Sequence, residues 1–159
     1  MSYDFVHLHV HTEYSLLDGA IRTKDLAAKV SCWDTKAVAM TDHGVMYGAV
    51  EFYENCNAQG VKPILGCETY VDPNGITSRE SKKANHLLLL AENDTGWHNL
   101  IKLISIANTQ GFDYKPRIDH DLLEKYHEGI IASSACLAGE IPQLIMSGSI
   151  QEAEKSMRP

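Results

Sequence analysis

Short apolar runs alternate along the chain with longer segments in which apolar side chains recur every three or four positions. Five runs are short enough to be strands: 5–10, 37–40, 62–71, 86–91 and 129–134. Helical spacing predicts helices at 23–33, 47–59, 94–109 and 119–126, and Ser149 with Glu152 fits a capping box that opens another. This alternation predicts an α/β fold with a parallel sheet, either open or curved into a barrel. The polar segment 72–85 predicts a loop or flap.

Side chains that bind metals follow several of the predicted strands. Alternate residues of a strand point to the same face, so His9 and His11 share one face with His7. In such sheets, catalytic groups collect at the carboxyl ends of the strands. The candidates near these ends are His9, His11, His43, Glu68 and Cys136.

Two further residues extend this set of candidates. Asp18 lies in the first loop, and His86 begins the strand at 86–91. Together the side chains are enough for two or three closely spaced transition metals, which activate water and hold both oxygens of an in-line phosphoryl displacement. Ordinary structural alternatives remain: a hydrogen-bonded polar stripe for the first histidines, a turn for Asp18, a capping or core role for His86 and a small buried side chain for Cys136.

Lys115 and Arg117 are the cations of most interest for phosphate chemistry. A guanidinium holds a phosphate through two parallel hydrogen bonds, and an ammonium adds a compact positive charge. Both residues flank Pro116, so an ordinary surface turn is the alternative.

The composition narrows the classes of protein. The 159 residues suffice for one ordinary domain, and the formal net charge of -7 argues against a surface that mainly grips nucleic acid by its phosphates. The four cysteines form no Cys-x-x-Cys pair, which predicts reduced thiols. No apolar run is long enough to cross a membrane, and residues 1–4 lack signal-peptide character, so we expect a cytoplasmic protein with no membrane partner.

Two motifs resemble the polymerase and histidinol phosphatase, or PHP, family: His9-Val10-His11-Thr12-Glu13-Tyr14-Ser15 and Thr41-Asp42-His43-Gly44. The resemblance is closest to the PHP domains at the amino terminus of the alpha subunits of bacterial replicative DNA polymerases. Further runs that carry it lie at 14–20, 48–53, 62–66, 115–117 and 136–142, so it covers nearly the whole chain.

The resemblance implies a distorted (β/α)7 TIM-like barrel with a trinuclear metal site in its mouth. The implied ligands are His9, His11, Asp18, His43, Glu68, His86 and Cys136, of which His9, His11, His43 and Glu68 would be catalytic. Zinc or manganese is expected, with iron as the alternative. The family's late Asp-x-His motif has no counterpart, so residues 1–159 are expected to be a PHP domain truncated before its last strands.

Three functions are compatible with this resemblance. In the first, the chain is part of a DNA-directed DNA polymerase that acts in replication. By itself the chain would then be at most a metal-dependent phosphoesterase or 3′-5′ exonuclease, and it would not polymerise DNA. Its partners would be the rest of the alpha subunit, the proofreading exonuclease subunit, DNA through the full-length protein and the sliding clamp through regions outside this sequence. The second function is a non-catalytic module that docks the proofreading subunit. The third is a stand-alone phosphatase, but Asp18 and Cys136 stand in place of histidines and argue against it.

Overall fold

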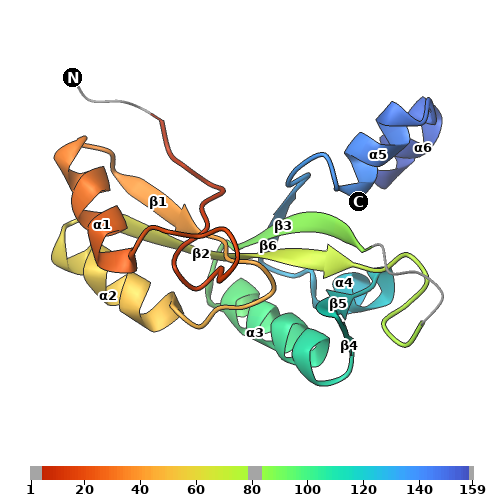
Figure 1. The fold of residues 1–159 in the computed structure, drawn as a ribbon, viewed down its shortest axis with the longest axis horizontal. Helices are drawn as coiled ribbons and strands as arrows, with labels where there is room; N and C mark the ends of the chain where they lie inside the picture. The colour runs from red at the N-terminus through yellow and green to blue at the C-terminus, as the bar shows by residue number, and fades with distance from the viewer. Residues whose placement is uncertain (1–4, 79–83, 158–159) are drawn as a thin grey trace.

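The computed structural model of the chain describes residues 5–78 and 84–157 and shows a mixed α/β fold (Figure 1). The helices are α1 (Thr23–Cys32), α2 (Ala49–Ala58), α3 (Asp94–Thr109), α4 (His120–Tyr126), α5 (Glu140–Met146) and α6 (Ile150–Ser156). The strands are β1 (Ala37–Met40), β2 (Lys62–Val71), β3 (Asn85–Ala91), β4 (Phe112–Asp113), β5 (Lys115–Ile118) and β6 (Ile130–Ser133). The four helices predicted from apolar spacing are confirmed, with ends that shift by at most two residues.

Strand β2 is the centre of the sheet, and its neighbours run in both directions. β1 and β5 pair with β2 in parallel, whereas β3 pairs with β2, and β6 with β3, in antiparallel orientation. The prediction of a parallel sheet was therefore wrong. A parallel pair needs a long crossover, usually a helix, and the described residues between β2 and β3 (72–78 and 84) contain none. The loop predicted at 72–85 is confirmed at 72–78, and its residues 79–83 lie outside the described part.

Residues 112–118 form the hairpin of β4 and β5, two strands that the apolar runs did not predict. Phe112 pairs with Pro116 and Asp113 with Lys115. Two further pairs, of which Tyr70 with Arg117 is one, join β5 to the end of β2. The hairpin thus places the Lys115-Pro116-Arg117 run beside the carboxyl end of the central strand.

The predicted first strand, 5–10, is extended but is not a regular strand. It runs beside β1 through one parallel bridge, between His7 and Val38. The amide of Ala39 donates to the carbonyl of His7 at 2.8 Å, and the amide of Thr41 donates to the carbonyl of Val10 at 2.9 Å. These bonds are enough to align His9 and His11 with the end of β1.

Two apolar clusters fix the helices on the sheet. One joins α1 and α2 to β1 through buried side chains that include Val30, Phe52 and Met40. The other joins α3 to β2 and β3 through side chains that include Leu89 and Leu103. These clusters attach α1, α2 and α3 to the strands (Figure 1), and the carboxyl half of β2 is buried.

Helix α5 was not predicted, and it packs with α6 as a separate pair at the periphery (Figure 1). Ser149 is the N-cap residue of α6, but its side chain caps no backbone amide, so the expected capping box does not form. Among the described residues, no helix is both long and apolar enough to span a membrane.

Candidate metal centre

The carboxylate of Glu68 lies at the centre of a cluster of imidazoles and is only 1% exposed. Its Oε2 atom is 2.5 Å from Nε2 of His9 and 3.1 Å from Nε2 of His11. Its Oε1 atom contacts Nδ1 of His86 and lies 3.7 Å from Nδ1 of His43. One carboxylate from the central strand is thus shared by four histidines from three other segments.

The antiparallel course of β3 explains why His86 joins this cluster although it stands near the start of its strand. The start of β3 lies beside the end of β2, with His86 opposite Tyr70 and Leu88 opposite Glu68. His43 follows β1 and bridges to Glu68 in parallel. Starts and ends of different strands therefore meet at one edge of the sheet.

Asp18 completes the cluster on the side of His43. Its Oδ2 atom is 2.9 Å from Nε2 of His43, and the rings of His11 and His43 stack with their centroids 4.0 Å apart. Ligand atoms within 4.8 Å of one another form three overlapping groups: His9 with His11 and Glu68, His11 with Asp18 and His43, and His43 with Glu68 and His86.

The donor set fits divalent metal ions. Among the described residues, Nδ1 of His11 and Nδ1 of His43 are buried and have no hydrogen-bond partner. A buried polar atom without a partner is costly, and imidazole nitrogens and carboxylate oxygens are ligands for zinc, manganese and iron. The geometry therefore allows the overlapping groups to hold more than one ion.

The electrostatics of the cluster keep its two carboxylates ionised. Burial acts to raise the pKa of Glu68, but hydrogen bonds to His11 and His9 and the charges of His43 and His86 lower it to about 2. The hydrogen bond to His43 lowers the pKa of Asp18, and burial lowers the pKa of His86. Both carboxylates are thus ionised at neutral pH, as metal binding requires.

Cys136 lies at the edge of the cluster. Its Sγ atom is 3.5 Å from Nδ1 of His86, and the residue is exposed. The amide of His86 donates to the carbonyl of Ala138 at 3.1 Å, so the loop that carries Cys136 is attached to the start of β3. The three compact groups of ligand atoms do not include this thiol.

Lys115 reaches the rim of the cluster by packing on an aromatic ring. Its Nζ atom is 4.3 Å from the centroid of the Tyr70 ring, and that ring is 5.0 Å from the ring of His86. Pro116 packs on Gly44, where a Cβ atom would lie only 2.5 Å from Cγ of the proline. A glycine next to His43 therefore lets Lys115 approach the cluster of histidines and carboxylates.

Arg117 points into the protein and has a different environment. It is 3% exposed, and its Nη1 atom is 2.5 Å from Oδ2 of Asp72. Its guanidinium also donates to the carbonyls of Ile76, Ser78 and Gly111. These contacts attach residues 72–78 to β5. They satisfy the guanidinium of Arg117 within the protein, so Arg117 needs no phosphate as a partner.

Tyr70 and Asp42 lie at the site but were not among the residues predicted from the sequence. Tyr70 holds Lys115, and Asp42 is fully buried between Thr41 and His43 with hydrogen bonds to Thr12 and Ser15. One available signal was the position of Asp42, a carboxylate directly after a buried strand. His7, which was predicted to share a strand face with His9 and His11, belongs to none of the three groups of ligand atoms and packs against the ring of Phe5 with centroids 4.8 Å apart.

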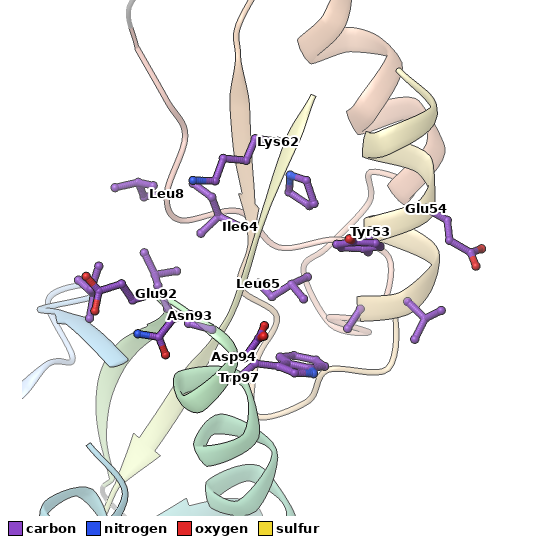
Figure 2. A pocket seen from close by; sticks show the side chains of 16 residues that line it. Leu8, Tyr53, Glu54, Lys62, Ile64, Leu65, Glu92, Asn93, Asp94 and Trp97 are labelled. Carbon is purple, nitrogen blue, oxygen red and sulfur yellow. The ribbon is translucent and has the colours of Figure 1, made fainter. Parts of the chain in front are cut away.

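A large apolar cavity of about 670 Å³ is separate from the cluster (Figure 2). Leu8 and Ile64 border it on one side of β2, and Leu65, Tyr53 and Trp97 border it on the other (Figure 2). None of the clustered histidines lines it. The candidate metal-binding residues therefore lie at the edge of the sheet and not in this cavity.

Known proteins share this sequence over nearly its full length. A DNA polymerase III subunit alpha from Treponema pallidum is 46% identical over 97% of this chain and 14% of its own length. One from Deinococcus radiodurans is 49% identical over 94% of this chain and 12% of its own length. The chain thus spans about one seventh of such relatives. Among solved structures, an amidohydrolase from Chromobacterium violaceum superposes with a TM-score of 0.48 at 19% identity, over 64% of this chain and 32% of that one.

The family model described as PHP domain matches residues 7–159, which include every residue of the histidine and carboxylate cluster. The chain belongs to the PHP domain family.

Proposed function

We propose that the chain binds two or three divalent metal ions and hydrolyses phosphate esters at them. The observation that carries the proposal is the buried, ionised carboxylate of Glu68 shared by four imidazoles. The proposed ligands are His9, His11, Asp18, His43, Glu68 and His86, with Cys136 at the edge. Zinc and manganese suit this mixed set best, and iron is the alternative.

Bound divalent ions lower the pKa of a water molecule and stabilise negative charge on a reacting phosphate. The chain itself holds Glu68 and Asp18 ionised through their histidine partners. Lys115, kept at the rim by the Tyr70 ring, supplies donors and a positive charge for a phosphate oxygen. We keep Lys115 as the proposed phosphate-binding residue and assign Arg117 to the structure of residues 72–78.

We further propose that the chain is the amino-terminal PHP domain of a bacterial DNA polymerase III alpha subunit, which acts in DNA replication in the cytoplasm. The relatives that carry this name match over nearly the whole chain. The polymerase reaction and most contacts with DNA and the sliding clamp would belong to the rest of that subunit. The net charge of -7 agrees with a domain that is not the main grip on DNA. A DNA 3′ end is then the natural candidate substrate.

The described sheet is proposed to be part of a seven-stranded distorted barrel. Leu8 lies beside β1 and Ile131 lies in β6, at the two ends of the row formed by β1, β2, β3 and β6. Both side chains nevertheless line the same cavity. This supports a sheet that curves so that its ends approach each other, as a barrel requires.

A non-catalytic docking module is the second candidate function. The loop that carries Asp18 favours it, because Leu16 and Leu17 are 88% and 102% exposed. Exposed apolar side chains of this kind mark protein-binding surfaces. In that case the metals stabilise the fold, and the proofreading subunit is the proposed partner.

Elemental analysis and hydrolysis assays test the catalytic proposal together. The double variant His9→Ala plus His11→Ala is compared with His98→Ala, whose ring on α3 bonds to the carbonyl of Asp94 in its own helix. The wild type and His98→Ala should bind about two or more metal ions and cleave a model phosphodiester and a 3′-labelled oligonucleotide. The double variant should lose both properties. Cleavage that survives in the double variant contradicts the proposal, and metal binding without cleavage favours the docking module.

A further inference from the structure

The carboxylate of Asp42 is fully buried next to the cluster, yet it is not one of the grouped ligand atoms. Its Oδ1 atom accepts hydrogen bonds from the amide of Thr12 at 2.6 Å and from the hydroxyl of Ser15 at 2.7 Å. Its Oδ2 atom accepts one from the hydroxyl of Thr12 at 2.7 Å. All three donors belong to the segment between His11 and Asp18.

The same residue is also connected to the other segments that form the cluster. The carbonyl of Asp42 accepts a hydrogen bond from the amide of Glu68 at 3.0 Å. The hydroxyl of Ser15 accepts one from the amide of His43 at 3.2 Å, and the carbonyl of Ser15 accepts one from the amide of Asp18 at 3.1 Å. Asp42 is thus bonded to both the first loop and β2, and it directly precedes His43 in the chain.

Asp42 carries its charge without a cationic side chain. Within residues 5–78 and 84–157, no lysine, arginine or histidine forms an ion pair with it. A buried charge is costly unless it is hydrogen-bonded and compensated. All three of its partners are hydrogen-bond donors, and its electrostatic effect on His11 has the same sign as those of Glu68 and Asp18. Such a concentration of negative charge favours a bound cation.

We propose that Asp42 is a positioning residue of the metal centre. Its carboxylate holds residues 12–18 in the conformation that places Asp18 opposite His43, and its charge favours a cation in the group of His11, Asp18 and His43. The inference rests on the metal site of the proposed function and adds a residue that contacts neither metal nor substrate.

The first test is a titration of the metal-free protein with zinc. Asp42→Asn is compared with wild type and with Asp72→Asn, the same substitution at another fully buried aspartate whose partner is Arg117. Elemental analysis gives the bound equivalents, and the side-chain nitrogen signals of the histidines show which rings bind. Asp42→Asn should require at least about tenfold more zinc to shift the His43 signal, because it loses hydrogen bonds to a charged group. Its His9 and His86 signals should respond as in wild type.

Asp72→Asn separates positioning from a general loss of stability. It should unfold more easily than wild type and still bind zinc normally at His43. A normal zinc response at His43 in Asp42→Asn overturns the proposal. Zinc binding without hydrolysis in wild type defeats the proposed catalytic function but leaves the comparison at His43 intact.

A second measurement does not depend on metal. Amide hydrogen exchange in the metal-free protein should be at least about tenfold faster for residues 12–18 in Asp42→Asn than in wild type, and unchanged there in Asp72→Asn. Equal exchange overturns the proposal even if the wild type binds no zinc. If Asp42→Asn does not fold, Ser15→Ala removes one donor to the Asp42 carboxylate together with the acceptor of the His43 amide, and it should weaken the zinc response of His43 by about threefold to tenfold. If the His43 signal of Ser15→Ala responds to zinc as in wild type, the proposal is overturned.

Discussion

The imidazole rings of His11 and His43 stack with their centroids 4.0 Å apart and 16° between their planes. His11 follows the extended segment 5–10 and His43 follows β1, so the stack results from the alignment of these two neighbours. The Nδ1 atoms of both rings are buried and have no hydrogen-bond partner among the described residues. The stack therefore brings two unpaired imidazole nitrogens close together, which suits the binding of a metal ion.

Glu68→Gln should abolish most metal binding while it preserves the size of the side chain. Two of the three groups of ligand atoms contain this carboxylate. In wild type, zinc at a hundredfold excess over its dissociation constant should add about 2.7 kcal/mol to the free energy of unfolding. Thermal unfolding with and without zinc measures the effect, and Glu68→Gln should show little or none. An equal rise in melting temperature in both proteins would show that Glu68 is not needed for the metal.

The stability of the metal-free protein should fall as the pH rises above neutrality. The hydrogen bond to Glu68 raises the pKa of His11 above its ordinary 6.5. The contribution of His11 to the free energy of unfolding is therefore complete below pH 6.5, and it is lost as the pH rises through the raised pKa of the folded state. The pKa of Glu68 is lowered from 4.5 to about 2. The contribution of Glu68 to the free energy of unfolding is therefore present above pH 4.5 and is lost as the pH falls toward 2. The interaction is therefore fully present between about pH 4.5 and 6.5.

Bound zinc should reverse this trend, because protons compete with the metal for imidazole. Unfolding in urea, with a chelator or with zinc, measures both curves between pH 4 and 9. His11→Gln should flatten the high-pH decline of the metal-free protein, whereas His98→Ala should not. A metal-free protein whose stability rises between pH 6.5 and 8 would contradict the assigned direction of the His11 shift.

The types of most elements were predictable from the sequence, but their directions were not. Apolar spacing identified α1, α2, α3 and α4, and apolar runs identified β1, β2, β3 and β6. Whether β3 runs with or against β2 depends on the connection between them, which has no periodic pattern. This mattered for His86, which appeared to stand at the wrong end of its strand and joins the cluster only because β3 is antiparallel.

The roles of charged residues were harder to predict than their presence. Arg117 and Lys115 stand two positions apart in the chain. Arg117 is 3% exposed and pairs with Asp72, whereas Lys115 packs over the ring of Tyr70 at the rim of the cluster. Residue type alone does not distinguish a buried guanidinium from a phosphate ligand, since both uses exploit the same donors. Burial, which tertiary packing decides, makes the distinction.

Arg117→Lys should destabilise the fold without removing the metal. A lysine cannot reproduce the set of bonds to Asp72 and to the carbonyls of Ile76 and Ser78, so a buried carboxylate is left poorly paired. Breaking a buried pair costs about 3 to 5 kcal/mol, and a partial replacement should approach the lower figure. Urea unfolding measures the loss, and elemental analysis should give unchanged zinc. Lys36→Ala, which breaks the exposed pair with Asp34, is the control and should unfold like wild type.

Lys115→Ala should weaken the binding of a phosphate ester and leave the metal in place. The Nζ atom of Lys115 lies over the Tyr70 ring beside His86, where it adds a positive charge without contributing a metal ligand. We expect KM for a phosphodiester to rise about tenfold, the effect of one lost hydrogen bond to a charged group, with a smaller change in kcat.

Lys102→Ala is the matched control for Lys115→Ala. Lys102 lies on α3 and packs over the ring of Tyr126 on α4, away from the cluster. It should leave KM and the zinc content unchanged. Lys115→Arg should recover most of the lost affinity, since a guanidinium supplies the charge and donors over the same ring. If Lys115→Ala loses zinc, the side chain supports the metal site itself. If it changes neither KM nor zinc content, the substrate phosphate binds elsewhere on the edge of the sheet.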